Sequence, residues 1–397
     1  MPSTSLLHIS DTHLGNRQYG SDIRRDDFAD AFERAIDVAI DRDVDAVIHT
    51  GDLFDDPVPS LETIVRAADV INTLNDNDIP FYGIVGNHER KNDEQWLDLL
   101  NRTSAANRLN RDYTLVGDVA IYGIDAVRPS TWETTEFDLA DPPEEASHSI
   151  LCMHELLSPM VSGKERVYPT TEVLERVSID LDGLALGDLH EPESATIMET
   201  DVWYASATER GAKDQEETGV VQLIEADDEG ITRRQIEIDT RPFAVFTIEF
   251  GEDDGVGHAR DVIARHTLDD CVAKIELTGE RSSVTANEVT QYARDAGAEV
   301  VSVDDNRGRV ELDVESIEAM SLQGLDGAIE EKLADQNLTE VALDIDERIR
   351  GGSIQTTNVN TVADSLTDTL RDAQERAFDQ TDVSADVDQA ETMEGRE

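Results

Sequence analysis

The chain has 397 residues and a formal net charge of −55, because 88 acidic side chains outnumber 33 basic ones. Hydrophobic residues still make up 39% of the chain and fall into periodic segments, which excludes a disordered acidic polymer. No window approaches the ~20 apolar residues of a membrane span. The only cysteines, Cys152 and Cys271, lie far apart in apolar runs, so we expect buried free thiols and no disulfide framework. This length predicts two or more domains.

Strand and helix patterns alternate along the first half of the chain. Apolar strand patterns at 6–10, 45–51 and 81–86 are separated by helix patterns, the second of which covers 61–74. The first helix pattern places apolar residues at every fourth position: Phe28, Phe32, Ile36 and Ile40. Such alternation predicts an α/β core with parallel strands.

Further strand patterns follow at 119–127, 149–154, 183–187 and 202–207. The next two, at 219–226 and 231–239, resemble antiparallel edge strands. Near Arg241 the pattern restarts, with strands and helices that predict a smaller α/β domain. Gly351 and Gly352 predict a linker. The segment after it has the pattern of a last helix with a narrow apolar stripe. We therefore predict domains at 1–240, 241–350 and 351–397, the last with a disordered tail.

Five stretches place metal-competent side chains just past the end of a buried strand. They are "ISDTHLG", "TGDLFD", "VGNHE", "CMHE" and "LGDLH". Because ligands of α/β sheets bind beyond the carboxyl ends of the strands, these loops should converge. The side chains concerned are Asp11, His13, Asp52, Asn87, His88, His154, Asp188 and His190.

Oxygen and imidazole donors without thiolates suit Mn²⁺ and similar ions. A carboxylate such as Asp52 has two oxygens and can bridge two ions. Two ions about 3.5–4 Å apart can clamp a phosphodiester and activate water for in-line attack. His88 can stay off the metals and donate a proton to the leaving oxygen. The sequence thus predicts a two-metal hydrolase of phosphate esters.

The remaining histidines carry no such pattern. His8 and His49 lie inside strands, and we expect both to be core histidines. His148, His258 and His266 have no partner motif, and we expect them at the surface.

The order of these motifs resembles the calcineurin-like metallophosphoesterase family over roughly residues 5–210. That resemblance implies a double β-sandwich flanked by helices, followed here by a capping domain and a C-terminal helical segment that binds a partner. "HISDTHLG", "GDLFD", "GNHE" and "ASATER" are most similar to the double-strand-break-repair nucleases of the Mre-eleven and SbcD type. This similarity implies that the protein is a Mn²⁺-dependent DNA endonuclease and exonuclease.

The resemblance also implies roles by matching position. Asp11, His13 and His190 would hold the first metal, Asp52 would bridge, and His88 would be the leaving-group catalyst. The second metal would be held by the remaining ligands: Asn87, His154 and Asp188.

Two positions depart from the family. Asp188 stands where related enzymes usually have His, which changes the charge of the second site. Asp55 stands where several relatives have a His that places a DNA end, so endonuclease activity is the firmer expectation.

Basic residues near these loops are candidates for phosphate contacts, with salt bridges to the abundant carboxylates as the alternative. The candidates are Arg17, Arg24, Arg25, Arg90, Lys91 and Arg128. By resemblance, Val362, Leu366 and Leu370 on the last helix would dock on a coiled-coil ATPase of the SbcC or Rad-fifty type. A helix packed on its own chain is the alternative. The family also dimerises, which we expect to involve helices near 61–74 and 94–109.

The acidic composition resembles that of proteins from extreme halophiles. At low salt such a surface repels DNA, but in multimolar salt the Debye length shrinks to about 3 Å, so the charge does not exclude a DNA substrate. No signal peptide is apparent, and we expect a cytoplasmic protein. A phosphodiesterase or phosphatase for small molecules and a catalytically idle scaffold that bridges DNA ends remain open alternatives.

Overall fold

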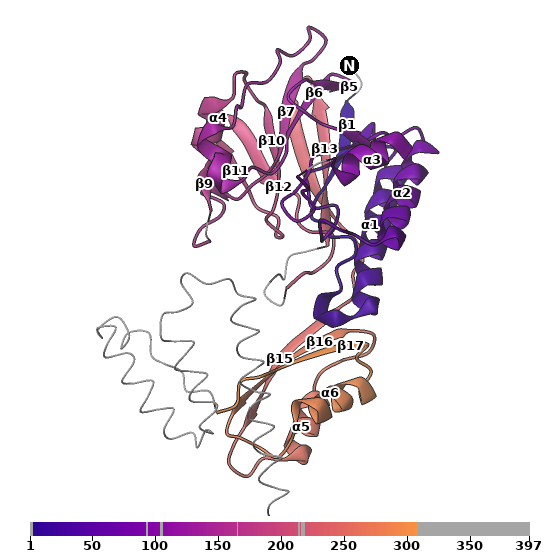
Figure 1. Ribbon diagram of the computed structural model, residues 1–397, viewed down its shortest axis with the longest axis vertical. Coiled ribbons are helices and arrows are strands. Elements are labelled where there is room, and N and C mark those ends of the chain that lie inside the picture. The colour runs from indigo at the N-terminus through magenta and orange to yellow at the C-terminus, as the bar shows by residue number, and fades with distance from the viewer. Residues whose placement is uncertain are drawn as a thin grey trace, which may run out of the picture. The chain divides into compact units, whose positions relative to one another are not determined.

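The computed structural model describes residues 3–308, apart from 93, 104–105, 165, 213–214 and 216–218 (Figure 1). The predicted last helix, with Val362, Leu366 and Leu370, lies outside the described residues. The predicted boundaries at 240 and 350 stay predictions, since residues 1–308 group as one compact unit.

Two six-stranded mixed sheets form the centre of the fold, which confirms the predicted double β-sandwich. The first sheet has the order β14-β13-β1-β2-β3-β4, and the second has the order β11-β12-β10-β7-β6-β5. Within the first, β1 to β4 are parallel, and within the second, β6, β7, β10 and β12 are parallel. The strands of the first sheet are β1 Thr4–Ile9, β2 Ala46–His49, β3 Phe81–Gly83, β4 Ala106–Arg108, β13 Val220–Asp227 and β14 Gly230–Glu237. Those of the second are β5 Thr114–Val116, β6 Val119–Ile124, β7 His148–His154, β10 Gly183–Gly187, β11 Ser194–Ile197 and β12 Thr200–Tyr204.

Alternating side chains on the parallel strands serve two different cores. Leu6 of β1 belongs to the core between the two sheets, together with Ile48 of β2, Cys152 of β7 and Trp203 of β12. Its neighbour Leu7 belongs to the core under the outer helices. Because successive strand residues point to opposite faces, a continuous apolar run buries both faces of a strand.

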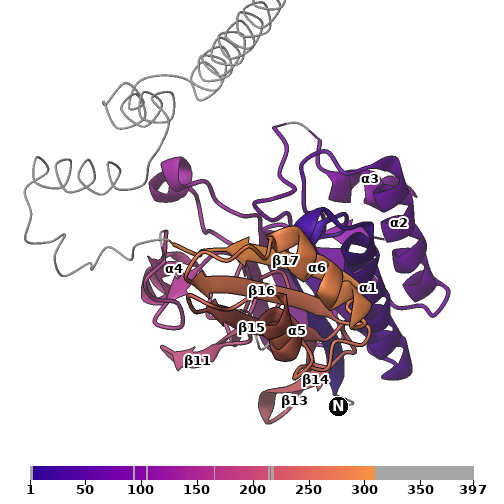
Figure 2. The same ribbon diagram turned by 90° about the horizontal axis from the view of Figure 1, so that it is seen from below.

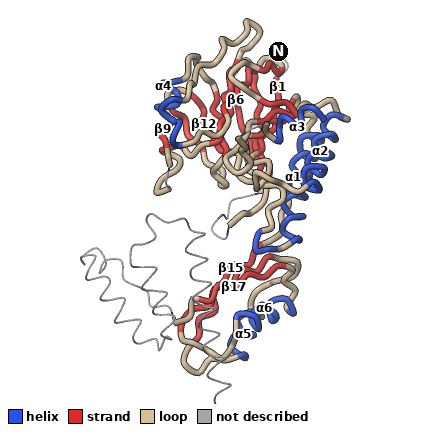
Figure 3. The backbone as a smooth tube through the Cα atoms, in the orientation of Figure 1, coloured by secondary structure: helices blue, strands red, loops and turns tan. Residues whose placement is uncertain are grey.

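Helices cover the outer face of each sheet (Figure 3). The first sheet is covered by α1 Asp22–Asp41, α2 Leu61–Asn75 and α3 Trp96–Thr103. On α1, Phe32, Ala35, Ile36 and Ala39 form the buried stripe that the spacing predicts. The second sheet is covered by η2 Pro129–Thr134, α4 Thr170–Arg176 and the short strands β8 Leu157–Ser158 and β9 Tyr168–Pro169. A single turn, η1 Gln18–Gly20, precedes α1.

The prediction that both strands after β12 lie at an edge is wrong for β13. β13 pairs antiparallel with both β1 and β14, so only β14 is at the edge of the sheet. The physical reason is visible in its burial, because both faces of β13 are covered and even Gln222 is only 1% exposed.

A separate three-stranded parallel sheet follows, with the order β15-β16-β17. The helices α5 and α6 cover one of its faces (Figure 2). Thr285 and Glu288 cap α6 reciprocally, which explains where that helix begins. In the described part of the chain no helix is long and apolar enough to cross a membrane. The bounds are β15 Phe243–Phe250, α5 Val256–Ile263, β16 Val272–Gly279, α6 Ala286–Asp295 and β17 Val300–Asp305.

Candidate metal centre

The predicted site residues follow the carboxyl ends of strands from both sheets. Asp11 and His13 follow β1, Asp52 follows β2, and Asn87 and His88 follow β3. From the second sheet, His154 ends β7, and Asp188 and His190 follow β10. A bridge between Ser10 and Ala207 joins the two sheets at this end. Parallel strands deliver all their carboxyl ends to one edge, so five separate turns meet there.

The turns themselves are tight, and several adopt the left-handed backbone region. Asp11, His13 and Asp52 have φ of 51°, 43° and 56°, and Asp188 has φ of 81°. Each such non-glycine residue costs about 1–3 kcal/mol, and residues of this kind cluster at functional sites. A side chain on Gly86 would overlap the Asp52 carboxylate, so glycine there permits the close approach of the two loops.

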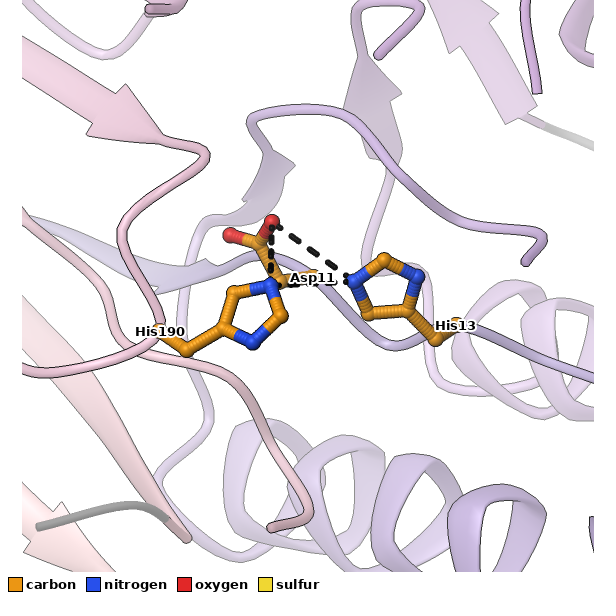
Figure 4. A group of neighbouring side chains, drawn as sticks. All are labelled: Asp11, His13 and His190. Atoms are coloured by element: carbon orange, nitrogen blue, oxygen red, sulfur yellow. Dashed lines mark hydrogen bonds and ion pairs between the residues drawn. The ribbon is translucent and has the colours of Figure 1, made fainter. Parts of the chain in front are cut away.

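One cluster joins Asp11, His13 and His190 (Figure 4). The two Nε2 atoms of His13 and His190 lie 3.2 Å apart. Asp11 Oδ1 lies 3.9 Å from His13 Nε2 and 3.7 Å from His190 Nε2. The structure therefore brings together the three donors that were assigned by resemblance to the first metal.

A second cluster joins Asp11, Asp52 and His154. Asp52 Oδ2 lies 3.2 Å from His154 Nε2 and 3.9 Å from His13 Nε2, so it reaches both clusters. His154 Nε2 also lies 3.2 Å from Asn87 Oδ1 and 3.8 Å from Asp188 Oδ1. This geometry brings together all the ligands predicted for a second metal and a bridge.

The carboxylates at this edge of the sheets create a negative potential that favours the binding of cations. Asp11 and Asp52 are fully buried, and the ion pairs of Asp11, Asp52 and Asp188 among the described residues are all with histidines. Burial raises the pKa of Asp11 to about 6. Burial alone would lower the pKa of His154, but the Asp52, Asp11 and Asp188 carboxylates raise it well above its usual value. Buried carboxylates without Lys or Arg partners are the arrangement that divalent cations satisfy, so the donor set fits metal ions.

His88 is exposed, with 49% of its side chain accessible. Its backbone N–H donates to Asp52 Oδ1 at 2.9 Å, and its Nδ1 lies 3.1 Å from the Asp55 carbonyl oxygen. Because that oxygen only accepts, Nδ1 carries a proton and Nε2 remains open. The ring stands 4.9 Å from His13, centroid to centroid, so it borders the clusters.

The sequence did not predict that two carboxylates, Asp55 and Glu89, support the site. Asp55 Oδ1 accepts from Asn16 Nδ2 at 3.1 Å and lies 3.3 Å from His13 Nδ1. Buried Glu89 accepts from the backbone N–H groups of Phe54 and Gly86, which pins the two loops together. Burial raises the pKa of Glu89 to about 7. The "GNHE" motif contains Glu89, and only its backbone contacts reveal its role.

The other histidines divide as predicted, with one exception. His8 accepts a hydrogen bond from Trp203 Nε1 at 2.9 Å, and His49 contacts Thr12, so both lie in the core. The surface prediction is wrong for His148, which is 9% exposed with Nε2 2.8 Å from the Asp227 carbonyl oxygen. It begins β7 and packs under the β13–β14 turn. Both cysteines are buried and free, as predicted.

The prediction of DNA contact is wrong for Arg24. Its side chain is fully buried and bonds Asp27 Oδ2 at 2.8 Å and Glu209 Oε1 at 3.0 Å. Arg17 is exposed but pairs with Asp22 at 2.9 Å. Arg25 and Lys91 also have partners, in Asp26 and in the ring of Trp96. Arg17, Arg24 and Arg25 thus form salt bridges within the chain, which was the alternative to phosphate contact.

Arg90 lies beside the second cluster and is accessible to a phosphate group bound there. It lines a cleft of about 410 Å³ together with Asn87, His154 and Asp188, and it donates to the Ala126 carbonyl oxygen. Arg128 is exposed and donates to Asn92 Oδ1 at 2.7 Å. Neither forms an ion pair among the described residues.

Residues 4–222 match the family model described as calcineurin-like phosphoesterase. The chain is 35% identical to the DNA double-strand break repair protein Mre11 of Haloferax volcanii over 98% of its length and 88% of that protein. It is 33% identical to the Halobacterium salinarum protein of the same name, over 88% of this chain and 90% of that one. The Mre11 of Methanosarcina mazei is 35% identical over 89% of this chain and 58% of that protein.

Proposed function

Because the chain belongs to the calcineurin-like phosphoesterases and, within them, to the Mre11 DNA double-strand break repair proteins, we propose that it is a metal-dependent DNA nuclease. The single observation that carries this proposal is the convergence of eight predicted side chains from five strand ends. Hydrolysis of a phosphodiester bond is the reaction that this edge is built to support.

Two Mn²⁺ ions per subunit are the cofactor that we propose. Asp11, His13 and His190 would hold one ion, and Asn87, His154 and Asp188 would hold the other. Asp52 would bridge, which its contacts with both His13 and His154 support. When bound, such ions supply charge stabilisation for the phosphoryl group and activate water.

The chain's own residues bind and orient the substrate around these ions. The cleft beside His154 and Asp188 receives the scissile phosphodiester, and Arg90 on its wall stabilises phosphate charge. His88 holds its Nδ1 proton on the Asp55 carbonyl oxygen, and its protonated Nε2 donates to the leaving oxygen. The strained turns keep these groups in place before substrate arrives.

The proposed partners are broken DNA ends, a second copy of the chain and a coiled-coil ATPase. An apolar surface supports the homodimer: Val58 is 78% exposed, Leu61 76%, Val65 49% and Leu99 36%. These side chains lie on or beside α2 and α3, the region predicted for dimer contact. The ATPase contact rests on the resemblance, because Leu366 and Leu370 lie outside the described residues.

A nuclease assay in multimolar KCl tests the proposal. Circular single-stranded DNA and end-blocked duplex DNA are incubated with the full chain in Mn²⁺, in Mg²⁺ and in EDTA, with and without the ATPase. We expect cleavage of the circle in Mn²⁺ and none in EDTA. A circular substrate has no ends, so its cleavage shows endonuclease activity directly.

Two further measurements separate the alternatives. Turnover of nucleotide monoesters without DNA cleavage would indicate a small-molecule phosphatase instead. Calorimetric titration counts the bound Mn²⁺, and fewer than two ions with no cleavage would indicate a scaffold. Either result would overturn the nuclease proposal.

A further inference from the structure

The three histidines that face the metal centre through Nε2 differ in what their Nδ1 atoms contact. His154 Nδ1 lies 2.7 Å from the Thr50 carbonyl oxygen. His13 Nδ1 lies 3.3 Å from Asp55 Oδ1, although without the geometry of a full hydrogen bond. The Thr50 oxygen only accepts, so His154 Nδ1 carries the proton, and the nearby Asp55 carboxylate favours a proton on His13 Nδ1 as well; each Nε2 then keeps its lone pair. A metal ion binds the unprotonated nitrogen, so His13 and His154 are already prepared for it.

His190 has the opposite arrangement. Its Nδ1 lies 2.7 Å from the side-chain nitrogen of Gln215. The Gly211 backbone N–H, which can only donate, lies 3.0 Å from Gln215 Oε1. The Gln215 amide oxygen must therefore face Gly211, and its NH₂ group must face His190. In a neutral imidazole, Nδ1 then accepts and Nε2 carries the proton.

This proton has a place to go while no ion is bound. His190 Nε2 lies 3.2 Å from His13 Nε2, so one nitrogen donates to the other. With His190 as donor, His13 accepts on Nε2 and keeps its own proton on Nδ1, toward Asp55. A row of hydrogen bonds with one consistent direction thus runs from Gln215 through His190 to His13.

Residues 209–211, which include the partner of Gln215, are anchored by buried polar and charged side chains. Gln18 Nε2 donates to the Gly211 carbonyl oxygen at 2.6 Å, and Gln18 Oε1 accepts from Arg24 Nε at 2.8 Å. Arg24 also donates to Glu209 Oε1 and to the Arg210 carbonyl oxygen, at 3.0 and 2.9 Å. Rotation of the Gln215 amide would break its bond to an anchored backbone group.

We propose that Gln215 is a positioning residue that holds His190 in the tautomer unable to bind a metal through Nε2. A cation at Asp11, His13 and His190 requires the His190 proton to move to Nδ1, which the Gln215 NH₂ group cannot accept. That position is therefore the weaker of the two and fills second. The inference rests on the metal centre of the proposed function.

Gln215→Glu is the direct test. A carboxylate keeps an acceptor for the Gly211 N–H and offers its second oxygen to a proton on His190 Nδ1. In metal-free protein with ¹⁵N-labelled histidine, nitrogen NMR should show the Nε2–H tautomer of His190 in the wild type and the Nδ1–H tautomer in the variant. His190→Gln assigns the signal, and the pH is kept where the ring is neutral.

Calorimetry with Mn²⁺ gives the second readout. The weaker of two binding events should tighten by about 10–100-fold in Gln215→Glu, the range typical of changes to a ligand's hydrogen-bond partner. Gln215→Met removes both hydrogen bonds at similar size, and its affinity should lie between those of the wild type and the Glu variant. Gln235→Glu adds the same charge on the exposed edge strand β14 and should leave both affinities unchanged.

An Nδ1–H tautomer in the wild type would overturn the inference. So would weaker Mn²⁺ binding by Gln215→Met, because the amide would then support the metal instead of opposing it. If the wild type binds two ions with the expected tautomer but leaves DNA intact, the proposed nuclease function fails while this inference stands. If DNA is cleaved and Gln215→Glu binds Mn²⁺ like the wild type, only this inference fails.

Discussion

At the scale of single residues, the proposed mechanism separates groups that hold cations from His88, which moves a proton. His154 is fully buried and its Nδ1 is fixed on a backbone oxygen, as a ligand requires. His88 is half exposed, and its backbone N–H, more than its ring, is tied to Asp52. The ring is therefore accessible from solvent, as the proposed leaving-group role requires.

Replacing His88 by Ala should slow DNA cleavage severely and leave metal binding intact. General acid catalysis contributes about 10²–10⁴-fold, so the rate should fall by that factor. Single-turnover cleavage and Mn²⁺ calorimetry on the same preparation measure the two quantities. His266→Ala, which removes an exposed histidine of the three-stranded-sheet region, serves as the control and should cleave normally. Loss of bound Mn²⁺ in His88→Ala would show that His88 is a ligand and would refute the assigned role.

Asp188→His should remain active within about 10-fold of the wild type. A tenfold loss of rate corresponds to a rise of about 1.4 kcal/mol in the activation barrier. Asp188 has φ of 81°, a region that both Asp and His populate more readily than most residues, and its side chain is 26% exposed, which leaves room for the ring. Exchanging carboxylate for imidazole favours softer ions, so the ratio of Mg²⁺-supported to Mn²⁺-supported cleavage should fall. A folded but inactive variant would mean that the site depends on the carboxylate charge.

At the scale of elements, the apolar patterns predicted most strands of the two sheets. Since the site lies at the strand ends, this also located the site. The helix expected at 61–74 is α2, which spans Leu61–Asn75. The strand expected at 81–86 ends at Gly83, because Val85 donates its N–H to the Asp125 side chain instead of a neighbouring strand. Every proposed metal ligand lies at or just after the end of a strand, which is why the sequence pattern could place it.

Groups that act through those ligands could not be predicted in this way. Asp55 and Gln215 approach His13 and His190 from the far side, and neither stands at a strand end. Arg24 reads as a surface residue near the site, yet it is buried by Asp27 and Glu209, which lies 185 residues away. Such contacts depend on how loops fold in three dimensions, which a periodic pattern does not record.

The face of α2 gives a prediction at this scale. Leu61 and Val65 are one turn apart and exposed, and burying each against a partner contributes about 1.5–3 kcal/mol at most. Leu61→Glu would bury a charge in such an interface and should convert a dimer into a monomer, as measured by light scattering after gel filtration in multimolar KCl. Val256→Glu, at a 39% exposed position on α5, should leave the dimer intact. A wild-type protein that stays monomeric at all concentrations would exclude this interface.

At the scale of the whole molecule, a net charge of −55 opposes folding through self-repulsion. The site adds to this cost, since buried Asp11 and Asp52 have only histidine partners for ion pairs among the described residues. Concentrated salt and bound divalent ions relieve two different parts of that repulsion. Salt screens the exposed carboxylates over distances beyond the Debye length, whereas a bound ion neutralises the buried ones directly.

The two effects can be separated by thermal unfolding of the metal-free and Mn²⁺-loaded protein across a range of KCl concentrations. The Debye length falls from about 10 Å at 0.1 M to about 3 Å at 1 M, so the melting temperature should rise most steeply over that interval in both forms. Mn²⁺ should add a further increment that persists in multimolar KCl, because buried ligands are screened little by salt. Sucrose at matched osmolality stabilises by exclusion without screening and should not reproduce the steep rise. A melting temperature that is insensitive to KCl would mean that the acidic surface is compensated locally, and the repulsion argument would fail even if the metal increment remained.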